Sequence, residues 1–182
     1  MSVIGNIFRS CLLFCMCMAC GQATPAGELP TPPAYLSEAG QAHYAQRVQQ
    51  IDAMPRLRGG VLFLGDSLIE GGDWQTYFPN TRLSNQGIGW DTVQGLKHRL
   101  SQISDHNPDK IILMIGTNDL GHGRSIAQTL ASLDYVLTAL QQANPQSHIY
   151  LHSVLPREEA LASTVISFNR GVRLVCTRKT GP

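Results

Sequence analysis

The chain has 182 residues, of which 43% are hydrophobic and 15% are charged, with 14 basic and 13 acidic side chains. This composition is typical of one globular domain with a sizeable core, and it excludes a disordered chain and a coiled coil. The net charge of +1 argues against nucleic-acid binding, because surfaces that bind phosphates carry a basic excess. Beyond the N-terminus, no apolar run is long enough to predict a transmembrane span.

Residues 1–23 are predicted to be an export signal. Arg9 precedes a short apolar run over residues 11–19, small residues follow it, and the run is too short for a transmembrane helix. A signal peptidase could cut near Ala23. Alternatively, residues 18–21 resemble a degenerate bacterial lipobox, in which Cys20 would carry lipid. We therefore expect a periplasmic, secreted or lipid-anchored protein; the alternative is a cytosolic protein with a buried N-terminal helix.

The cysteines do not predict a disulfide framework or a metal site. Four of the five lie within the predicted signal, and no His lies near them. The fifth, Cys176, is predicted to be a small apolar residue on a helix face. Residues 24–35 are rich in proline and predict an extended spacer. The folded domain is expected over residues 36–182.

Hydrophobic patterns after the spacer alternate between strand and helix. In chain order they predict a helix over 37–53, strands over 61–64 and 82–84, a helix over 91–103, a strand over 111–115, a helix over 125–143, a strand over 148–154 and a helix over 164–176. This alternation predicts an α/β fold with a parallel sheet covered on both faces. No internal repeat is visible.

Three predicted strand-to-helix turns carry polar and glycine residues. They read Gly65-Asp66-Ser67-Leu68, Asn85-Gln86-Gly87-Ile88-Gly89-Trp90-Asp91 and Gly116-Thr117-Asn118-Asp119. Right-handed crossovers would bring all three turns to one edge of the sheet. There they would offer a hydroxyl, a closely approachable N–H and a carboxamide, which are the nucleophile and oxyanion hole of acyl transfer. Each motif alone is also ordinary turn or helix-cap composition.

Taken together, these blocks resemble the SGNH (GDSL) hydrolases over about residues 58–175, with three of the family's four blocks in order. The segments 67–74 and 152–156 look like its bacterial acylhydrolase branch, which includes esterases that deacetylate sugars. The G-x-S-x-G elbow of the α/β-hydrolases is absent. The resemblance implies a three-layer α/β/α sandwich and a serine esterase without metal or organic cofactor. A small carboxylic ester, such as an O-acetylated sugar, is the expected substrate; a lysophospholipase or thioesterase is the alternative enzyme.

The resemblance also implies a role for individual residues. Ser67 would attack the ester carbonyl. Its own N–H, the N–H of Gly87 and the side-chain amide of Asn118 would hold the oxyanion. Asp66 is expected to organise its turn, and Asp119 to make a buried structural contact.

Other residues near these turns are open to two interpretations. Trp74 and Trp90 flank the site and could form its walls, but core packing is an equal alternative. Arg157, Glu158 and Glu159 are expected to form a solvated entrance to the last helix.

The catalytic base of the family has no counterpart in the sequence. The fourth family block supplies a His with an Asp three residues before it, whereas here no Asp follows Asp134 and no His follows His152. His122 and His152 could approach the site, but a solvated loop residue and a packed strand residue are the favoured interpretations. The expectation is therefore a truncated form of a longer hydrolase without its last strand, which would leave 148–154 as an exposed edge. The alternative is a non-catalytic relative that binds a carbohydrate or lipid.

Overall fold

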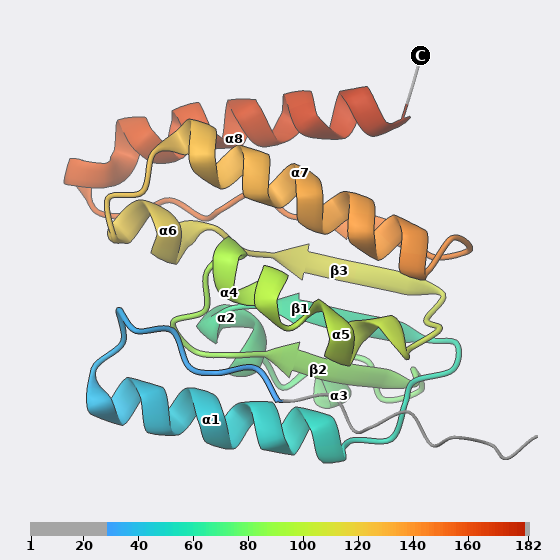
Figure 1. Cartoon of the computed structure of the whole chain (residues 1–182). Coiled ribbons are helices and arrows are strands. Elements are labelled where there is room, and N and C mark those ends of the chain that lie inside the picture. Colours follow the sequence, from blue (N-terminus) through green and yellow to red (C-terminus); the bar gives the residue numbers. More distant parts are fainter. Residues whose placement is uncertain (1–28, 181–182) are drawn as a thin grey trace, which may run out of the picture.

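The computed structural model describes residues 29–180, so the predicted signal with Cys20 lies outside the described part of the chain. In chain order the elements are α1 (Glu38–Ala53), β1 (Val61–Gly65), α2 (Ser67–Glu70), α3 (Trp74–Tyr77), β2 (Leu83–Gly87), α4 (Val93–His98), α5 (Leu100–Ser104), β3 (Lys110–Met114), α6 (Thr117–Gly121), α7 (Ile126–Ala143), β4 (His148–Leu151) and α8 (Glu159–Thr180) (Figure 1). None of the helices within these residues is long and apolar enough to cross a membrane.

The four strands form one parallel sheet in the order β2-β1-β3-β4, which confirms the predicted α/β fold. Gly65 at the end of β1 pairs in register with Gly87 of β2 and Met114 of β3. The turns that follow these three strands therefore start at the same edge of the sheet, as the crossover rule requires. In parallel sheets this edge is where ligands bind.

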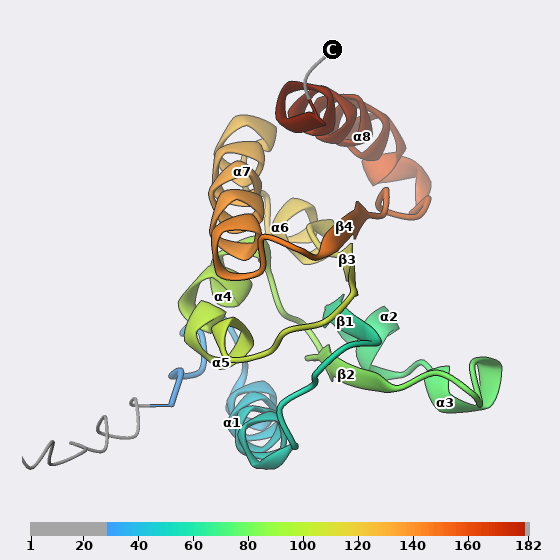
Figure 2. The same cartoon turned by 90° about the vertical axis from the view of Figure 1, so that its right-hand side faces the viewer.

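Helices lie on both faces of the sheet, in three layers. Figure 2 shows α4, α5 and α7 on one face and α2 and α3 on the other, with α8 alongside α7. Side chains of strand β1 pack on both faces of the sheet, because successive side chains of a strand point in opposite directions. Leu62 and Leu64 are buried in the main hydrophobic cluster, whereas Phe63 stacks on Trp74.

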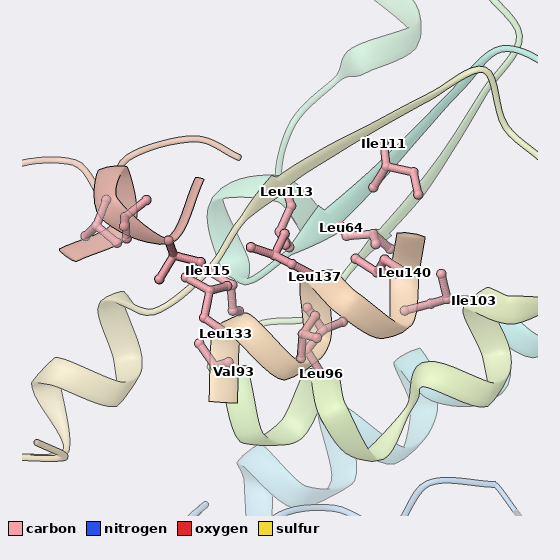
Figure 3. Packing of buried hydrophobic residues seen from close by; sticks show 14 of the residues in the cluster. Leu64, Val93, Leu96, Ile103, Ile111, Leu113, Ile115, Leu133, Leu137 and Leu140 are labelled. Carbon is pink, nitrogen blue, oxygen red and sulfur yellow. The ribbon is translucent and has the colours of Figure 1, made fainter. Parts of the chain in front are cut away.

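The main core lies between the sheet and the helices α4, α5 and α7 (Figure 3). Its side chains come at helical spacing from the helices and at alternate positions from the strands. They include Leu64, Val93, Leu96, Ile103, Ile111, Leu113, Leu133, Leu137 and Leu140. Cys176 packs against this cluster from α8, which confirms its predicted place on a helix face.

The predicted helix over 91–103 is wrong in one respect, because it is divided into α4 and α5 at Arg99. The Arg99 side chain is fully buried and reaches back to donate to Asp91 Oδ2 and to the Gly65 carbonyl. The Arg99 backbone leaves the helical conformation, with φ −106° and ψ 16°. A tertiary contact therefore overrides the continuous apolar periodicity from which one helix was predicted.

The predicted strand over 148–154 is also shorter in the structure, where β4 ends at Leu151. Val154 instead exchanges two hydrogen bonds with the side chain of Asn169 on α8, at 3.0 Å and 2.9 Å. Among the described residues, β3 is the one strand that pairs with β4, so the outer edge of β4 has no strand beside it. Helix α8 is longer than predicted, and the short helices α2, α3 and α6 were not predicted.

Candidate active site

A cavity of about 280 Å³ opens at the carboxyl edge of the sheet. The turns after β1 and β3 and the segment between β4 and α8 form its walls. Its lining residues are Asp66, Ser67, Leu68, Met114, Thr117, Asn118, Val154, Leu155, Pro156 and Arg157. A larger hollow of about 720 Å³ lies beside α7, β4 and α8, away from these turns. The smaller cavity is the candidate site, because it brings the predicted hydroxyl and carboxamide together.

Ser67 is placed at the mouth of the cavity by a turn that Asp66 organises. Strand β1 ends at Gly65, and α2 begins at Ser67, which is exposed to solvent. The buried Asp66 carboxylate accepts a hydrogen bond from the Leu68 N–H at 3.1 Å, which confirms its predicted role. Burial raises the pKa of Asp66 above its usual value. Ser67 is therefore accessible to a substrate on a turn with a fixed shape.

Asn118 approaches the cavity from the first turn of α6. Its Nδ2 donates to the Asp91 carbonyl at 2.8 Å, which leaves its second amide hydrogen for another acceptor. The neighbouring Asp119 is fully buried, accepts from the Val93 N–H at 2.9 Å and lies 3.4 Å from Arg124. The prediction that Asp119 makes a structural contact is thus confirmed.

Gly87 lies at the end of β2, in contact with α2. Its N–H donates to Asn85 Oδ1 at 3.0 Å, and neither Gly87 nor Trp90 is among the residues that line the cavity. A Cβ on Gly87 would lie 2.3 Å from the Glu70 backbone nitrogen, so the residue is glycine because α2 packs directly on β2. The use of its N–H as an oxyanion donor stays a prediction, and in this structure that hydrogen is bound to Asn85.

The turn after β2 nevertheless presents one N–H that the sequence analysis missed. The N–H groups of residues 87, 88, 89 and 91 donate to Asn85 Oδ1, the Gly65 carbonyl, the Glu70 carboxylate and the Ile88 carbonyl. Among the described residues, the Trp90 N–H has no acceptor. Trp90 has a φ of +60°, a region that residues other than glycine rarely adopt. No sequence signal marks this N–H, because residue type does not predict a tryptophan at positive φ.

Three other predicted neighbours of the site lie outside the cavity lining. Trp74 stacks on Phe63 with ring centroids 4.5 Å apart, so its core interpretation is the correct one. His122 packs on the Tyr35 ring at 4.7 Å, and His152 Nδ1 lies 2.7 Å from the Ser153 carbonyl.

Arg157 differs from the expectation of a solvated helix entrance. It lines the cavity, and its Nη1 donates to the Thr117 carbonyl at 3.2 Å. Glu158 and Glu159 are exposed as predicted. Within residues 29–180, no three His, Cys, Asp or Glu side chains are grouped so that they could hold a metal ion.

Two curated proteins are similar to this chain in sequence. The platelet-activating factor acetylhydrolase IB subunit alpha1 of Pongo abelii is 26% identical over 146 residues, which cover 75% of this chain and 60% of the relative. The Bos taurus subunit is 27% identical over 103 residues, or 53% of this chain and 44% of the relative. The chain thus spans about half the length of these relatives.

Solved structures share the fold. AlinE4, an SGNH-hydrolase family esterase, is 26% identical with a TM-score of 0.55, over 68% of this chain and 72% of that one. A GDSL-like lipase from Bacteroides thetaiotaomicron is 20% identical with a TM-score of 0.59, over 78% of this chain and 76% of that one. The sequence model of the GDSL-like lipase/acylhydrolase family matches residues 63–179, more than half of the chain, and the protein therefore belongs to that family.

Proposed function

We propose that this chain carries the acyl-transfer site of a serine esterase for small carboxylic esters, with acetyl esters such as O-acetylated sugars as the preferred class. The observation that carries the proposal is the cavity shared by Ser67 and Asn118 at the carboxyl edge of the sheet. A hydroxyl and an amide donor that line one small cavity form the minimal arrangement for attack on an acyl group.

In this mechanism, Ser67 Oγ attacks the acyl carbon and the bond to the alcohol oxygen breaks. The electron pair leaves with the alcohol, the Ser67 proton is released and the alcohol takes up one proton, so acylation is balanced. Water then attacks the acyl-Ser67 ester, releases the carboxylic acid and returns the proton to Ser67. Both steps pass through a tetrahedral oxyanion that needs hydrogen-bond donors.

The donors that we propose are the Asn118 side-chain amide, the Ser67 N–H and the Trp90 N–H. Trp90 replaces Gly87 because the Gly87 N–H is bound to Asn85, whereas the Trp90 N–H has no acceptor within residues 29–180. The hydrogen bond from Asn118 to the Asp91 carbonyl keeps the turn after β2 next to α6. Each such donor contributes about 2.7–4 kcal/mol to stabilisation of the transition state.

Two observations support a small acyl group. The cavity of about 280 Å³ is near the lower end of the sizes that hold small-molecule ligands, roughly 300–1,000 Å³. The curated relatives are named for hydrolysis of an acetyl ester, that of platelet-activating factor. Longer acyl chains of lysophospholipids or thioesters would need more apolar surface than this cavity supplies.

Proton transfer from Ser67 is the weak step for the described residues, because none of the residues that line the cavity is a histidine that could act as the base. Serine hydrolases that lack their triad retain roughly 10³–10⁴-fold acceleration over water from binding and the oxyanion hole. An ester with an acidic alcohol needs little help to expel its leaving group. We therefore expect slow acylation by p-nitrophenyl acetate and still slower deacylation, so that acetyl-Ser67 accumulates.

The test is the reaction of the 182-residue chain with p-nitrophenyl acetate, followed by release of p-nitrophenol and by mass spectrometry of peptides. We expect one acetyl group on the Ser67 peptide, none in Ser67→Ala, and unchanged labelling in Ser101→Ala, which removes an exposed hydroxyl from α5. Equal p-nitrophenol release by the parent and Ser67→Ala would contradict the mechanism. Saturable binding of acetylated sugars without Ser67-dependent turnover would favour the non-catalytic binding module instead.

We also propose that the protein is exported, and that Cys20 carries lipid if the lipobox is used. The support is the basic residue, short apolar run and small residues over 1–23. Fractionation of bacteria that express the chain, with Cys20→Ser beside the parent, tests both parts. Parent protein in the cytosol contradicts export, whereas release of the Cys20→Ser variant from membranes supports the anchor.

A further inference from the structure

The turn over residues 88–91 is the most strained part of the candidate site. Trp90 is the one residue other than glycine with positive φ among the described residues, and such a conformation is unfavourable for a residue that has a Cβ. Its indole is half exposed, so burial of the side chain does not explain the conformation. Strained residues persist where surrounding contacts determine them, which directs attention to the groups that hold the turn.

Glu70 is the centre of those contacts. Its Oε2 accepts the N–H of Gly89, the residue before Trp90, and lies 3.0 Å from His43 Nε2. Its Oε1 lies 3.6 Å from Arg47 Nε. Glu70 also belongs to α2, one helical turn after Ser67, so a single short helix carries both the nucleophile and the group that holds the turn.

Two residues of helix α1 also contact the end of β2 and the turn that follows it. Arg47 donates to the Gly87 carbonyl at 2.9 Å and to the Asn85 carbonyl at 2.7 Å. The His43 ring meets the Trp90 indole edge to face, with centroids 5.4 Å apart. The Glu70 side chain is about one-fifth exposed, and hydrogen bonds to a charged group are stronger than those between neutral groups. These contacts therefore hold the turn against the strain at Trp90.

We infer that Glu70, held by His43 and Arg47, is a positioning residue that fixes the turn over 88–91 so that the Trp90 N–H faces the oxyanion. The inference rests on the proposed function for its catalytic consequence, but the fixing of the turn is a separate physical statement. Glu70 acts through Gly89 and does not touch the reacting atoms. Its loss therefore lowers the rate of acylation and leaves substrate affinity nearly unchanged.

The experiment uses Trp74→Phe as the parent, because the chain then holds Trp90 as its single tryptophan. Phenylalanine at position 74 keeps an aromatic ring against Phe63. Acrylamide quenching of Trp90 fluorescence reports the turn without reference to activity. The acylation rate with p-nitrophenyl acetate and its KM report the chemistry. Glu70→Ala removes the acceptor, whereas Glu70→Gln keeps an oxygen for the Gly89 N–H.

We expect Glu70→Ala to increase quenching of Trp90 and to lower the acylation rate by about 10²-fold at unchanged KM. Glu70→Gln should recover most of both losses, and Asp134→Asn, an exposed acid on α7, should change neither. His43→Ala provides a milder second test of the same turn if Glu70→Ala does not fold.

Unchanged quenching and rate in Glu70→Ala would overturn the inference, as would a slower rate with an unaltered Trp90 signal. Absence of Ser67-dependent acylation in the parent overturns the proposed function instead. In that case the quenching of Trp90 fluorescence alone decides whether Glu70 holds the turn over residues 88–91.

Discussion

Arg99 Nε lies 2.8 Å from Asp91 Oδ2, and both side chains are completely buried. This ion pair joins the turn after β2 to the point where α4 meets α5, and Arg99 also donates to the carbonyl of Gly65 at 3.3 Å. Burial raises the pKa of Asp91 to about 6, although the Arg99 guanidinium opposes the shift. The pair therefore connects the end of β1 with the turn that borders Asn118.

Removal of the Arg99 guanidinium should strongly destabilise the folded protein. Arg99→Leu leaves the Asp91 carboxylate buried without its partner, which typically costs about 3–5 kcal/mol. We expect a lower midpoint of urea unfolding, with little change for Arg170→Leu, which removes an exposed cation from α8. If the two variants unfold at the same urea concentration, the pair does not contribute to stability.

The same pair shows what the sequence can and cannot predict. Strand β3 and helix α7 were predicted within one residue, because their apolar patterns are long and regular. The interruption at Arg99 depends on a carboxylate eight positions away, which no local pattern contains. At the site, residue types predicted Ser67 and Asn118. Our proposal of Trp90 in place of Gly87 depends on which backbone N–H is already bound, and the residue types do not contain that information.

The buried side chain of His106 should make the free energy of unfolding depend on pH. It is buried, its Nδ1 accepts the Leu57 N–H at 2.9 Å, and burial lowers its pKa. Because the unfolded chain binds the proton more readily, the free energy of unfolding should fall as pH drops below about 6.5, the ordinary pKa of histidine. Buried carboxyl groups such as Asp91, whose pKa is raised, act in the opposite direction at lower pH.

The histidine contribution is measured as a difference between variants. Urea unfolding of the parent and His106→Gln at pH 7.5 and pH 5.5 should show a smaller loss of stability on acidification in the variant. His148→Gln, at an exposed position on β4, is the control and should keep the slope of the parent. Identical slopes in the parent and His106→Gln would contradict this assignment.

Gly116 should tolerate no side chain, because conformation and space both oppose one. Its φ is +118°, and a Cβ would lie 2.8 Å from the Phe168 ring. Gly123 has a φ of +73° but nothing within 4 Å of its Cβ position, so Gly123→Ala isolates the backbone cost of roughly 1–2 kcal/mol. Gly116→Ala should lose about 1–3 kcal/mol more through crowding of the core. Thermal unfolding measures both, and equal losses would exclude the contribution from Phe168.

Removal of the Asn118 amide should slow acylation far more than it alters binding. Asn118→Ala deletes a proposed donor to the oxyanion, and loss of one such donor lowers the rate by about 10²–10³-fold. The p-nitrophenol release assay measures this directly, with circular dichroism to confirm that the fold is retained. Gln142→Ala, which removes an exposed amide from α7, should react like the parent.

Asn118→Asp removes both roles of this side chain while nearly keeping its size. An aspartate has nearly the same size, but it supplies no donor when ionised, so it can neither bind the Asp91 carbonyl nor stabilise an oxyanion. Its negative charge would also repel the developing charge on the substrate, and the rate should therefore fall at least as far as in Asn118→Ala. An Asn118→Asp protein that acylates Ser67 at the parental rate would show that the oxyanion forms elsewhere in the cavity.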